Sequence, residues 1–245
     1  MAKHGKKYRA AIERIEEGRL YGPSAAFALL KEIDGAGYDA TVECAFRLGI
    51  DPRKADQMVR GAVSLPHGIG KSVTVAVVAS GDKVAEARDA GADHVGGDDL
   101  VEQLSAGDLL TELDSVIATP DMMGKLGRLG KVLGPRGLMP NPKSGTVTMN
   151  VGQAVTEIKA GRVEYRSDRN GNVHTILGKA SFDVERLVDN YATLLEEILR
   201  QRPSAAKGRY IRSVTISTSA SPGVPLDPAK SRDLVEDDED AVATA

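Results

Sequence analysis

The residues between Gly124 and Gly145 combine positive charge with an unusual backbone composition. The 22 residues GKLGRLGKVLGPRGLMPNPKSG contain six glycines, three prolines and five lysines or arginines, and no acid. Three kinds of function fit such a segment: a phosphate-binding loop of a nucleotide enzyme, a surface that contacts nucleic acid, or a solvated loop shaped by glycine and proline. The spacing of its residues decides between them.

Positively charged residues recur at a regular interval in this segment. They are Lys125, Arg128 and Lys131, followed in the Pro/Gly-rich part by Arg136 and Lys143. Residues three apart lie on one side of a helical turn, so the spacing predicts a cationic ridge that can hold phosphates. We interpret the five residues as a secondary basic surface, with a solvated loop as the alternative.

Nucleotide chemistry has weaker support. A phosphate-binding loop places a glycine five residues before the second glycine of its motif, but Leu65 stands at that distance before Gly70-Lys71-Ser72. The glycines of 124–137 at spacing three do not fit the dinucleotide pattern G-x-G-x-x-G. A nucleotide-dependent enzyme that uses the middle of the chain therefore remains only as the alternative function.

Candidates for a catalytic or metal centre are absent from the sequence pattern. The four histidines stand far apart, without a cysteine or histidine neighbour at metal-ligand spacing: His4, His67, His94 and His174. Adjacent carboxylates such as Glu196-Glu197 diverge around a helix. We predict a protein that is not an enzyme and has no catalytic residues, metal or cofactor.

A second basic cluster, RQRPSAAKGRYIRS at 200–213, leads into a strand rich in hydroxyl groups at 213–221. Serine and threonine side chains can contact riboses, phosphates and base edges. Strand alternation places Ser217, Ser219 and Ser221 on one face. The alternative is an ordinary polar edge strand.

Composition limits the other possibilities. The chain has 245 residues, of which 41% are hydrophobic, and this content is sufficient for buried cores. Only 4% are aromatic and none is Trp, which disfavours recognition of nucleic acid by base stacking alone. The longest apolar run, at 73–79, is too short to span a membrane, and Cys44 is the single cysteine. We expect a cytoplasmic protein with no membrane contact, which is a monomer when free.

The formal charge of −3 is dominated by the end of the chain. Seven acids and two basic residues lie from Asp227 onward, which leaves 30 basic and 28 acidic residues before it. The segment 229–245 is predicted to be an acidic disordered tail. Charge must therefore be assessed locally.

The pattern of helices and strands changes twice along the chain. Between about 73 and 133, apolar runs alternate with helical segments, which is typical of a parallel sheet covered on both faces. Helices are expected at 8–18, 23–33, 82–92, 98–107, 154–161, 181–202 and from Pro120, and strands at 41–50, 73–80, 93–96, 115–119, 162–168, 173–178 and 210–219. The last two strands before the long helix are predicted to form a hairpin, joined through the turn at 169–172.

These patterns predict two domains of mixed class, α/β and α+β. Residues 1–67 and 159–228 form one discontinuous α+β domain from both ends of the chain. Residues 68–158 form an inserted Rossmann-like α/β domain with three layers. Two crossings between the domains predict a hinge.

Several stretches together resemble one known family, the bacterial large-subunit ribosomal proteins of the L-one type. The motifs are LGIDPRKADQMVRGAVSLPHGIGK at 48–71, PDMMGKLGRLGKVLGPRGLMPNPKSGTV at 120–147, GKASF at 178–182 and the serine-rich strand near 213–219. The resemblance covers nearly the whole chain up to about Pro228.

The resemblance implies a split RNA-binding domain with an inserted Rossmann-like domain. It also implies a function: a structural protein that binds large-subunit (23S) rRNA, forms the mobile stalk and assists release of deacylated tRNA from the exit site. The free protein is expected to repress translation by binding its own operon mRNA.

Residues that match the family's RNA contacts are distributed over four segments of the terminal domain. They are Tyr38, Thr41, Glu43, Asp168, Arg169, Lys179, Ser213, Ser219, Ala220 and Ser221. Asp168 and Arg169 match an acid-base pair near the RNA. The sequence Ser219-Ala220-Ser221 replaces the family's usual Thr-Met-Gly, which removes a long apolar side chain and adds a Cβ where glycine permits close approach.

Overall fold

The computed structural model describes residues 5–107 and 109–232. The chain divides into two compact units. The terminal unit comprises Met1–Val59, Leu65–Gly70 and Tyr165–Ala245, and the inserted unit comprises Arg60–Ser64 and Lys71–Glu164. The predicted acidic tail lies, from residue 233 on, outside the described residues.

The terminal unit holds an antiparallel sheet and helices. Its elements are α1 (Lys6–Ile12), α2 (Pro23–Ile33), β1 (Thr41–Leu48), η1 (Ala55–Gln57), β7 (Asn172–Lys179), α8 (Val184–Arg200), β8 (Ile211–Thr218) and β9 (Val224–Leu226). The strands follow the order β7-β1-β8-β9, and β1 is antiparallel to both of its neighbours. The central strand therefore pairs with two strands that come much later in the sequence.

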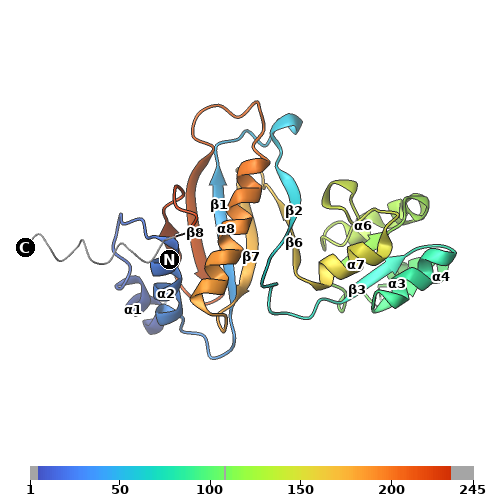
Figure 1. The fold of residues 1–245 in the computed structure, drawn as a ribbon, viewed down its shortest axis with the longest axis horizontal. Coiled ribbons are helices and arrows are strands. Elements are labelled where there is room, and N and C mark those ends of the chain that lie inside the picture. The colour runs from blue at the N-terminus through green and yellow to red at the C-terminus, as the bar shows by residue number, and fades with distance from the viewer. Residues whose placement is uncertain (1–4, 108, 233–245) are drawn as a thin grey trace, which may run out of the picture. The chain divides into compact units, whose positions relative to one another are not determined.

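One face of this sheet is covered by α8 and α2. Side chains of β1 alternate between buried and more exposed positions, and α8 buries one stripe at helical spacing that includes Leu187, Tyr191, Leu194 and Ile198. The ring of Tyr191 stacks on Phe46 with centroids 6.2 Å apart. Figure 1 shows α8 lying across β1 and β7.

The inserted unit contains a parallel sheet of order β4-β3-β5. Its elements are β2 (Arg60–Ser64), β3 (Val75–Val78), α3 (Asp82–Asp89), β4 (His94–Gly96), α4 (Asp98–Ala106), β5 (Ser115–Ala118), η2 (Pro120–Met122), α5 (Met123–Leu126), η3 (Gly127–Leu129), α6 (Gly130–Leu133), η4 (Pro142–Ser144), α7 (Val151–Lys159) and β6 (Arg162–Arg166), whose last two residues are counted with the terminal unit.

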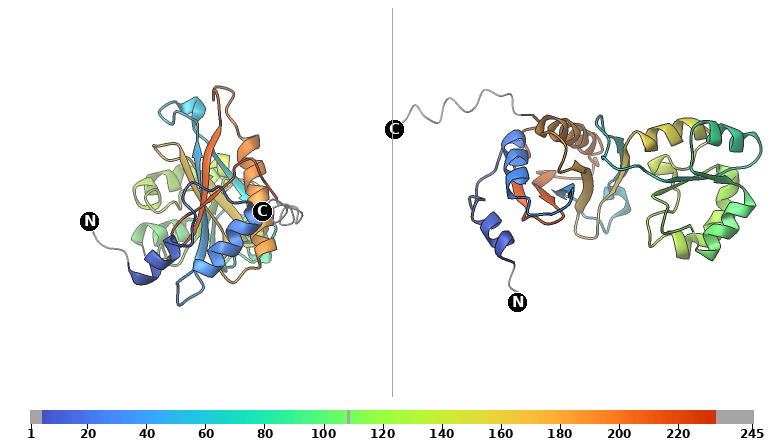
Figure 2. Two further views of the ribbon diagram at one scale, coloured as in Figure 1. Left: turned by 90° about the vertical axis from the view of Figure 1, so that its left-hand side faces the viewer. Right: turned by 90° about the horizontal axis from the view of Figure 1, so that it is seen from below.

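Helices pack on both faces of the parallel sheet. One core joins Ala76 and Val78 to α4 and to the helical segment from η2 to α6, and the other joins Val75 and Val77 to α3 and α7. Figure 2 (right) shows helices on both sides of these strands. The continuous apolar run of β3 is thus explained, since both of its faces are buried.

The expected mixed α/β class is confirmed, whereas one predicted pairing is wrong. The strands at 162–168 and 173–178 do not form a regular hairpin, because β6 pairs with β2 and β7 pairs with β1. The turn between them exists, but the only bridge between its arms among the described residues joins Ser167 to Val173. Turn residues fix the chain reversal, while the available neighbours decide which strands pair.

A buried hydroxyl of β7 leads to a prediction on stability. Thr175 is 6% exposed, and its Oγ1 has no hydrogen-bond partner among the described residues. Because an unpaired buried hydroxyl is destabilising, Thr175→Val is expected to stabilise the protein by about 1 kcal/mol. Urea unfolding measures this difference. A lower stability of the variant would show that the hydroxyl has a partner in solution.

Candidate nucleic-acid interface

The second face of the terminal sheet presents polar side chains to solvent. These side chains alternate with the buried ones along three strands. We call this surface the open face; it consists of Thr41, Glu43, Ala45 and Arg47 on β1, Asn172, His174 and Ile176 on β7, and Ser213, Thr215 and Ser217 on β8.

The register places these side chains in rows across the strands. Glu43 lies between Ile176 and Ser217, and Arg47 lies between Asn172 and Ser213. At about 3.3 Å per residue, the six steps along β1 from Thr41 to Arg47 separate the two ends of the open face by about 20 Å. The surface is therefore long enough to contact several nucleotides.

One end of the open face gathers most of the residues expected to contact RNA. The Nζ of Lys179 donates to the Thr41 hydroxyl at 2.9 Å, and the Ser219 N–H donates to the Thr41 carbonyl at 3.2 Å. We define the hydroxyl end as Tyr38, Thr41, Lys179 and Ser219–Ser221. Hydroxyl groups, one cation and one aromatic ring thus lie together, although they come from three separate segments.

Tyr38 belongs to a loop that is fixed to the GKASF segment. The carboxylate of Asp39 accepts hydrogen bonds from the N–H and the hydroxyl of Ser181, both at 2.9 Å, and the Ala180 N–H donates to the Ala40 carbonyl at 2.8 Å. Tyr38 itself is 64% exposed. An exposed ring on an anchored backbone can stack on a base or a ribose.

The turn after β8 is organised by the buried hydroxyl of Thr218. This hydroxyl donates to Asp34 at 2.9 Å and accepts from the N–H of Ser221 at 3.1 Å and of Ala220 at 3.4 Å. Ser219 and Ala220 are exposed at the tip. The turn therefore presents these two residues on a fixed backbone.

Ser221 occupies the position where the resemblance leads one to expect glycine. Its hydroxyl accepts the Thr218 N–H at 2.9 Å and donates to the Pro222 carbonyl at 3.0 Å. Its φ is not positive, so a Cβ causes no backbone strain at this position. The serine hydroxyl is thus engaged within the turn.

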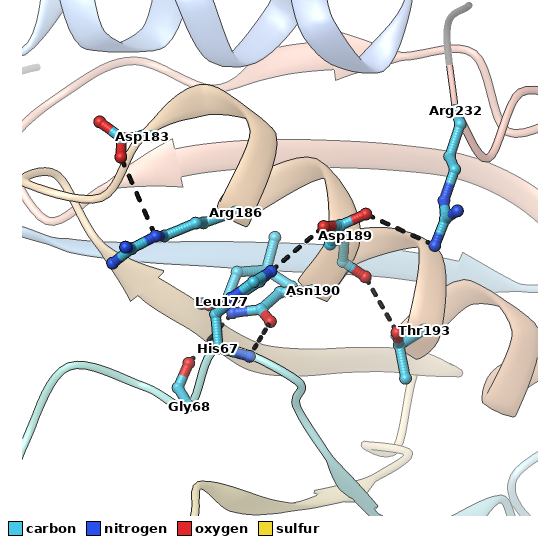
Figure 3. Close-up of polar contacts among 9 residues, drawn as sticks. All are labelled: His67, Gly68, Leu177, Asp183, Arg186, Asp189, Asn190, Thr193 and Arg232. Carbon is cyan, nitrogen blue, oxygen red and sulfur yellow. Dashed lines mark hydrogen bonds and ion pairs between the residues drawn. The ribbon is translucent and has the colours of Figure 1, made fainter.

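A buried asparagine supports the strand end that carries Lys179. The pairing of β1 with β7 shifts between Val42 and Glu43, which leaves a bulge at Leu177. The side-chain amide of the fully buried Asn190 donates to the Leu177 carbonyl at 2.7 Å (Figure 3). The bulge carbonyl, which lacks a regular sheet partner, is thereby satisfied.

The same asparagine also holds the segment 65–70. Its amide nitrogen donates to the Gly68 carbonyl at 3.0 Å and its oxygen accepts the His67 N–H at 3.1 Å, as Figure 3 shows. The neighbouring Asp189 carboxylate lies 3.1 Å from Nε2 of His67 and 3.4 Å from Nη2 of Arg232. This network fixes the backbone beneath Lys179. No motif pointed to Asn190, because a single polar residue in an amphipathic helix carries no distinctive spacing.

Asp168 and Arg169 lie at the opposite end of the open face. The Asp168 carboxylate accepts the N–H groups of Asn170 and Asn172 at 2.8 and 2.7 Å and the Asn172 side-chain amide at 3.1 Å. Partial burial raises the pKa of Asp168, but these hydrogen bonds outweigh the burial, and the pKa lies below its ordinary value. Asp168 therefore shapes the turn, and the exposed Arg169 is presented by it.

The basic segment of the inserted unit forms a succession of short helices. Lys125, Arg128 and Lys131 are exposed on α5, η3 and α6, while the leucines between them are buried. Lys125 forms an ion pair with Asp98. Arg136 is exposed in the following loop, and Lys143 lies within η4.

Evidence for a catalytic or metal site is lacking in the part of the chain that the structure describes. Lys71, which the enzyme alternative would place on phosphates, pairs with Asp114 at 2.6 Å. Residues 5–107 and 109–232 contain no cluster of three or more His, Cys, Asp or Glu residues suited to a metal ion. Within the same residues, each helix is too short or too polar to cross a membrane.

A sheet face that presents hydroxyl, amide and guanidinium groups offers the side chains by which proteins contact nucleic acids. The model of the ribosomal protein L1p/L10e family matches residues 29–222. The chain belongs to this family. It is not an enzyme, and the nucleotide-dependent alternative is excluded.

Proteins named large ribosomal subunit protein uL1 are similar over nearly the full chain. The one from Thermobifida fusca (strain YX) is 58% identical over 234 residues, which cover 96% of this chain and 99% of the relative. Those from Kitasatospora aureofaciens and Rhodococcus erythropolis (strain PR4 / NBRC 100887) are 57% and 56% identical over 241 residues, which cover 98% of this chain and all of each relative.

Proposed function

We propose that the protein is a structural component of the large ribosomal subunit in the cytoplasm and binds 23S rRNA through the open face of its terminal unit. The observation that carries this proposal is the hydroxyl end, where three segments bring together groups that suit RNA. The uL1 names of the relatives and the family membership support it. The terminal unit is thus the RNA-binding domain of the proposed two-domain architecture.

The composition of the open face favours readout of RNA shape. Hydroxyl and amide groups can bond to 2′-hydroxyls and base edges, and these contacts distinguish RNA from DNA. Glu43 lies within the same face and disfavours a phosphate at that position, whereas it can accept a hydrogen bond from a base or a ribose. Affinity is then expected to combine specific contacts with a few phosphate contacts.

We further propose that the protein forms the mobile stalk that assists release of deacylated tRNA from the exit site. The secondary basic surface at Lys125, Arg128, Lys131, Arg136 and Lys143 is suited to passing RNA, since cations attract phosphates without sequence preference. The free protein would bind its own operon mRNA through the open face and repress translation, because one RNA surface can hold two RNAs of similar shape.

Filter binding to the stalk fragment of large-subunit rRNA tests the main proposal. The protein is titrated against this fragment and against an unrelated structured RNA of equal length over a series of salt concentrations. We expect a preference for the stalk fragment that persists as salt rises. Equal affinity for both RNAs at every salt concentration would contradict the proposed function.

Ala220→Met restores the long apolar side chain that the resemblance leads one to expect. Ala220 is exposed at the turn tip, so methionine fits without disturbing the fold. We expect about three- to tenfold tighter binding to the rRNA fragment, from added apolar contact with RNA. Filter binding with Ala220→Gln, a polar side chain of similar length, is the matched control. Unchanged or weaker binding of the methionine variant would place the turn tip away from the RNA.

A further inference from the structure

We propose that four arginines at the end of the open face opposite the hydroxyl end form a second RNA contact that binds the phosphate backbone. This arginine end consists of Arg47, Arg169, Arg209 and Arg212. The inference rests on the proposed RNA-binding function and deepens it, because it divides the site into two parts with different chemistry.

Three separate segments meet at the arginine end. The Leu48 N–H donates to the Gly171 carbonyl at 2.9 Å, which joins β1 to the turn that carries Arg169. The Gly49 N–H donates to the Tyr210 carbonyl at 2.6 Å, which joins β1 to the segment between Arg209 and Arg212. The backbone therefore brings together arginines that are far apart in the sequence.

A bulge in β8 changes the direction of its side chains at this end. Arg47 pairs with Ser213 and Leu48 pairs with Ile211, so Arg212 is the additional residue on β8. Arg212 and Ser213 are consecutive and both exposed, which regular strand alternation does not permit on a half-buried sheet. The bulge thus exposes Arg212 beside the row that contains Arg47.

Gly49 permits the close approach of these segments. A Cβ at this position would stand 2.3 Å from the Arg209 carbonyl oxygen and 3.5 Å from Nε of Arg212. The first distance is shorter than any real Cβ contact with backbone, so any other residue at this position must displace the 209–212 segment. The glycine therefore supports a geometry that places Arg212 against the end of β1.

The arginine end lacks local neutralisation. Among residues 5–107 and 109–232, none of the four guanidinium groups forms an ion pair with a carboxylate; Arg209 donates to the Ile211 carbonyl at 3.1 Å. Asp168 in the adjoining turn keeps its negative charge, but its carboxylate bonds to the turn amides, and the four guanidinium groups outnumber it. Glu43 lies four residues, about 13 Å, along β1 from Arg47. The local charge is therefore strongly positive, although the whole chain is formally negative.

Guanidinium groups bind phosphate oxygens through two parallel hydrogen bonds. At about 20 Å from Thr41, the arginine end contacts a different part of the same RNA from the hydroxyl end. Phosphate contacts position a nucleic acid without reading its sequence, while hydroxyl and base-edge contacts discriminate. The arginine end accordingly contributes affinity and salt dependence, and the hydroxyl end contributes specificity.

The test uses the full chain with Arg47, Arg169 and Arg212 replaced by glutamine. Arg209 is retained because it bonds the backbone. The matched control replaces Arg14, Arg19 and Arg186 by glutamine, which changes the net charge equally at exposed arginines outside the open face and outside the basic cluster at 200–213. Both variants are titrated against the rRNA stalk fragment and an unrelated structured RNA from low to high salt, and circular dichroism verifies folding.

We expect the arginine-end variant to bind both RNAs about 10- to 100-fold more weakly near 0.15 M salt. The slope of log affinity against log salt should fall in magnitude by about two to three, while the ratio of the two affinities stays unchanged. Equal slopes for the variant and the wild type, or an equal fall in the control, would overturn the proposal. A change in the ratio alone would assign these arginines to specificity and also overturn it. Failure of the proposed function would give a different result from failure of this inference, since the wild type itself would then show no preference for the stalk fragment.

Discussion

Asn190→Leu is expected to destabilise the protein by about 3–5 kcal/mol and to weaken RNA binding by the remaining folded molecules. Leucine fills a similar volume, but it leaves the His67 N–H and the carbonyls of Gly68 and Leu177 without their partner. A fully buried polar group left unpaired, here the Leu177 carbonyl, costs about 1–3 kcal/mol, and the two partly buried groups add smaller amounts. Since the bulge at Leu177 precedes Lys179, the hydroxyl end loses its support as well.

Urea unfolding gives the stability, and filter binding below the unfolding transition gives the affinity for the rRNA fragment. Thr193→Ala is the matched control, because its hydroxyl lies one turn away and donates only to the Asp189 carbonyl of its own helix. The control should change stability by about 0.5 kcal/mol or less. If Asn190→Leu unfolds at the wild-type urea concentration, the amide does not hold the bulge in solution.

Thr218→Val is expected to reduce affinity for the rRNA fragment by about 10- to 100-fold and to lower stability by less than Asn190→Leu does. The substitution keeps the branched shape but removes the hydroxyl that ties the 218–221 turn to Asp34. Ser219 and Ala220 would then have to be ordered during binding, and the entropy of that ordering lowers affinity. Loss of the hydrogen bond to Asp34, which keeps its bond from the Ala36 N–H, and of the acceptor for the Ser221 N–H accounts for about 1–3 kcal/mol of lost stability.

Thr218→Ser separates the hydroxyl from the rest of the side chain. It retains the donor and acceptor and should bind RNA within about threefold of the wild type. Thr175→Val makes the same chemical change at a buried position of β7, outside the 218–221 turn, and should leave the affinity for the rRNA fragment unaltered. Wild-type affinity of Thr218→Val would mean that the turn needs no fixed conformation to bind.

Most secondary structure follows directly from local patterns. The alternation in TVECAFRL predicts β1, the apolar run at 73–79 predicts β3, and the wide apolar stripe of 181–202 predicts α8. These predictions succeed because burial on one face or on both faces leaves a periodic trace in the sequence. Strand pairing leaves no such trace, and the predicted hairpin between β6 and β7 failed for that reason.

The candidate site was predicted in part. Resemblance indicated Tyr38, Thr41 and Lys179, which the structure brings together at the hydroxyl end. Arg47 and Asn190 were missed, because an exposed arginine and a buried asparagine each have many ordinary roles. A partial signal for Arg47 was available, since it follows Thr41 and Glu43 at the alternation of one strand face.

The central position of β1 has a consequence for the order of events during synthesis. β1 is made before both of its partners: β7 begins 124 residues after the end of β1, at Asn172, and β8 begins only at Ile211. The strands of the parallel sheet lie between Val75 and Ala118, so that sheet can form while β8 is still unmade. A nascent or truncated chain that ends before residue 211 cannot display the open face. The proposed binding through this face would therefore require a polypeptide that has been synthesised through β8 and the turn at 218–221.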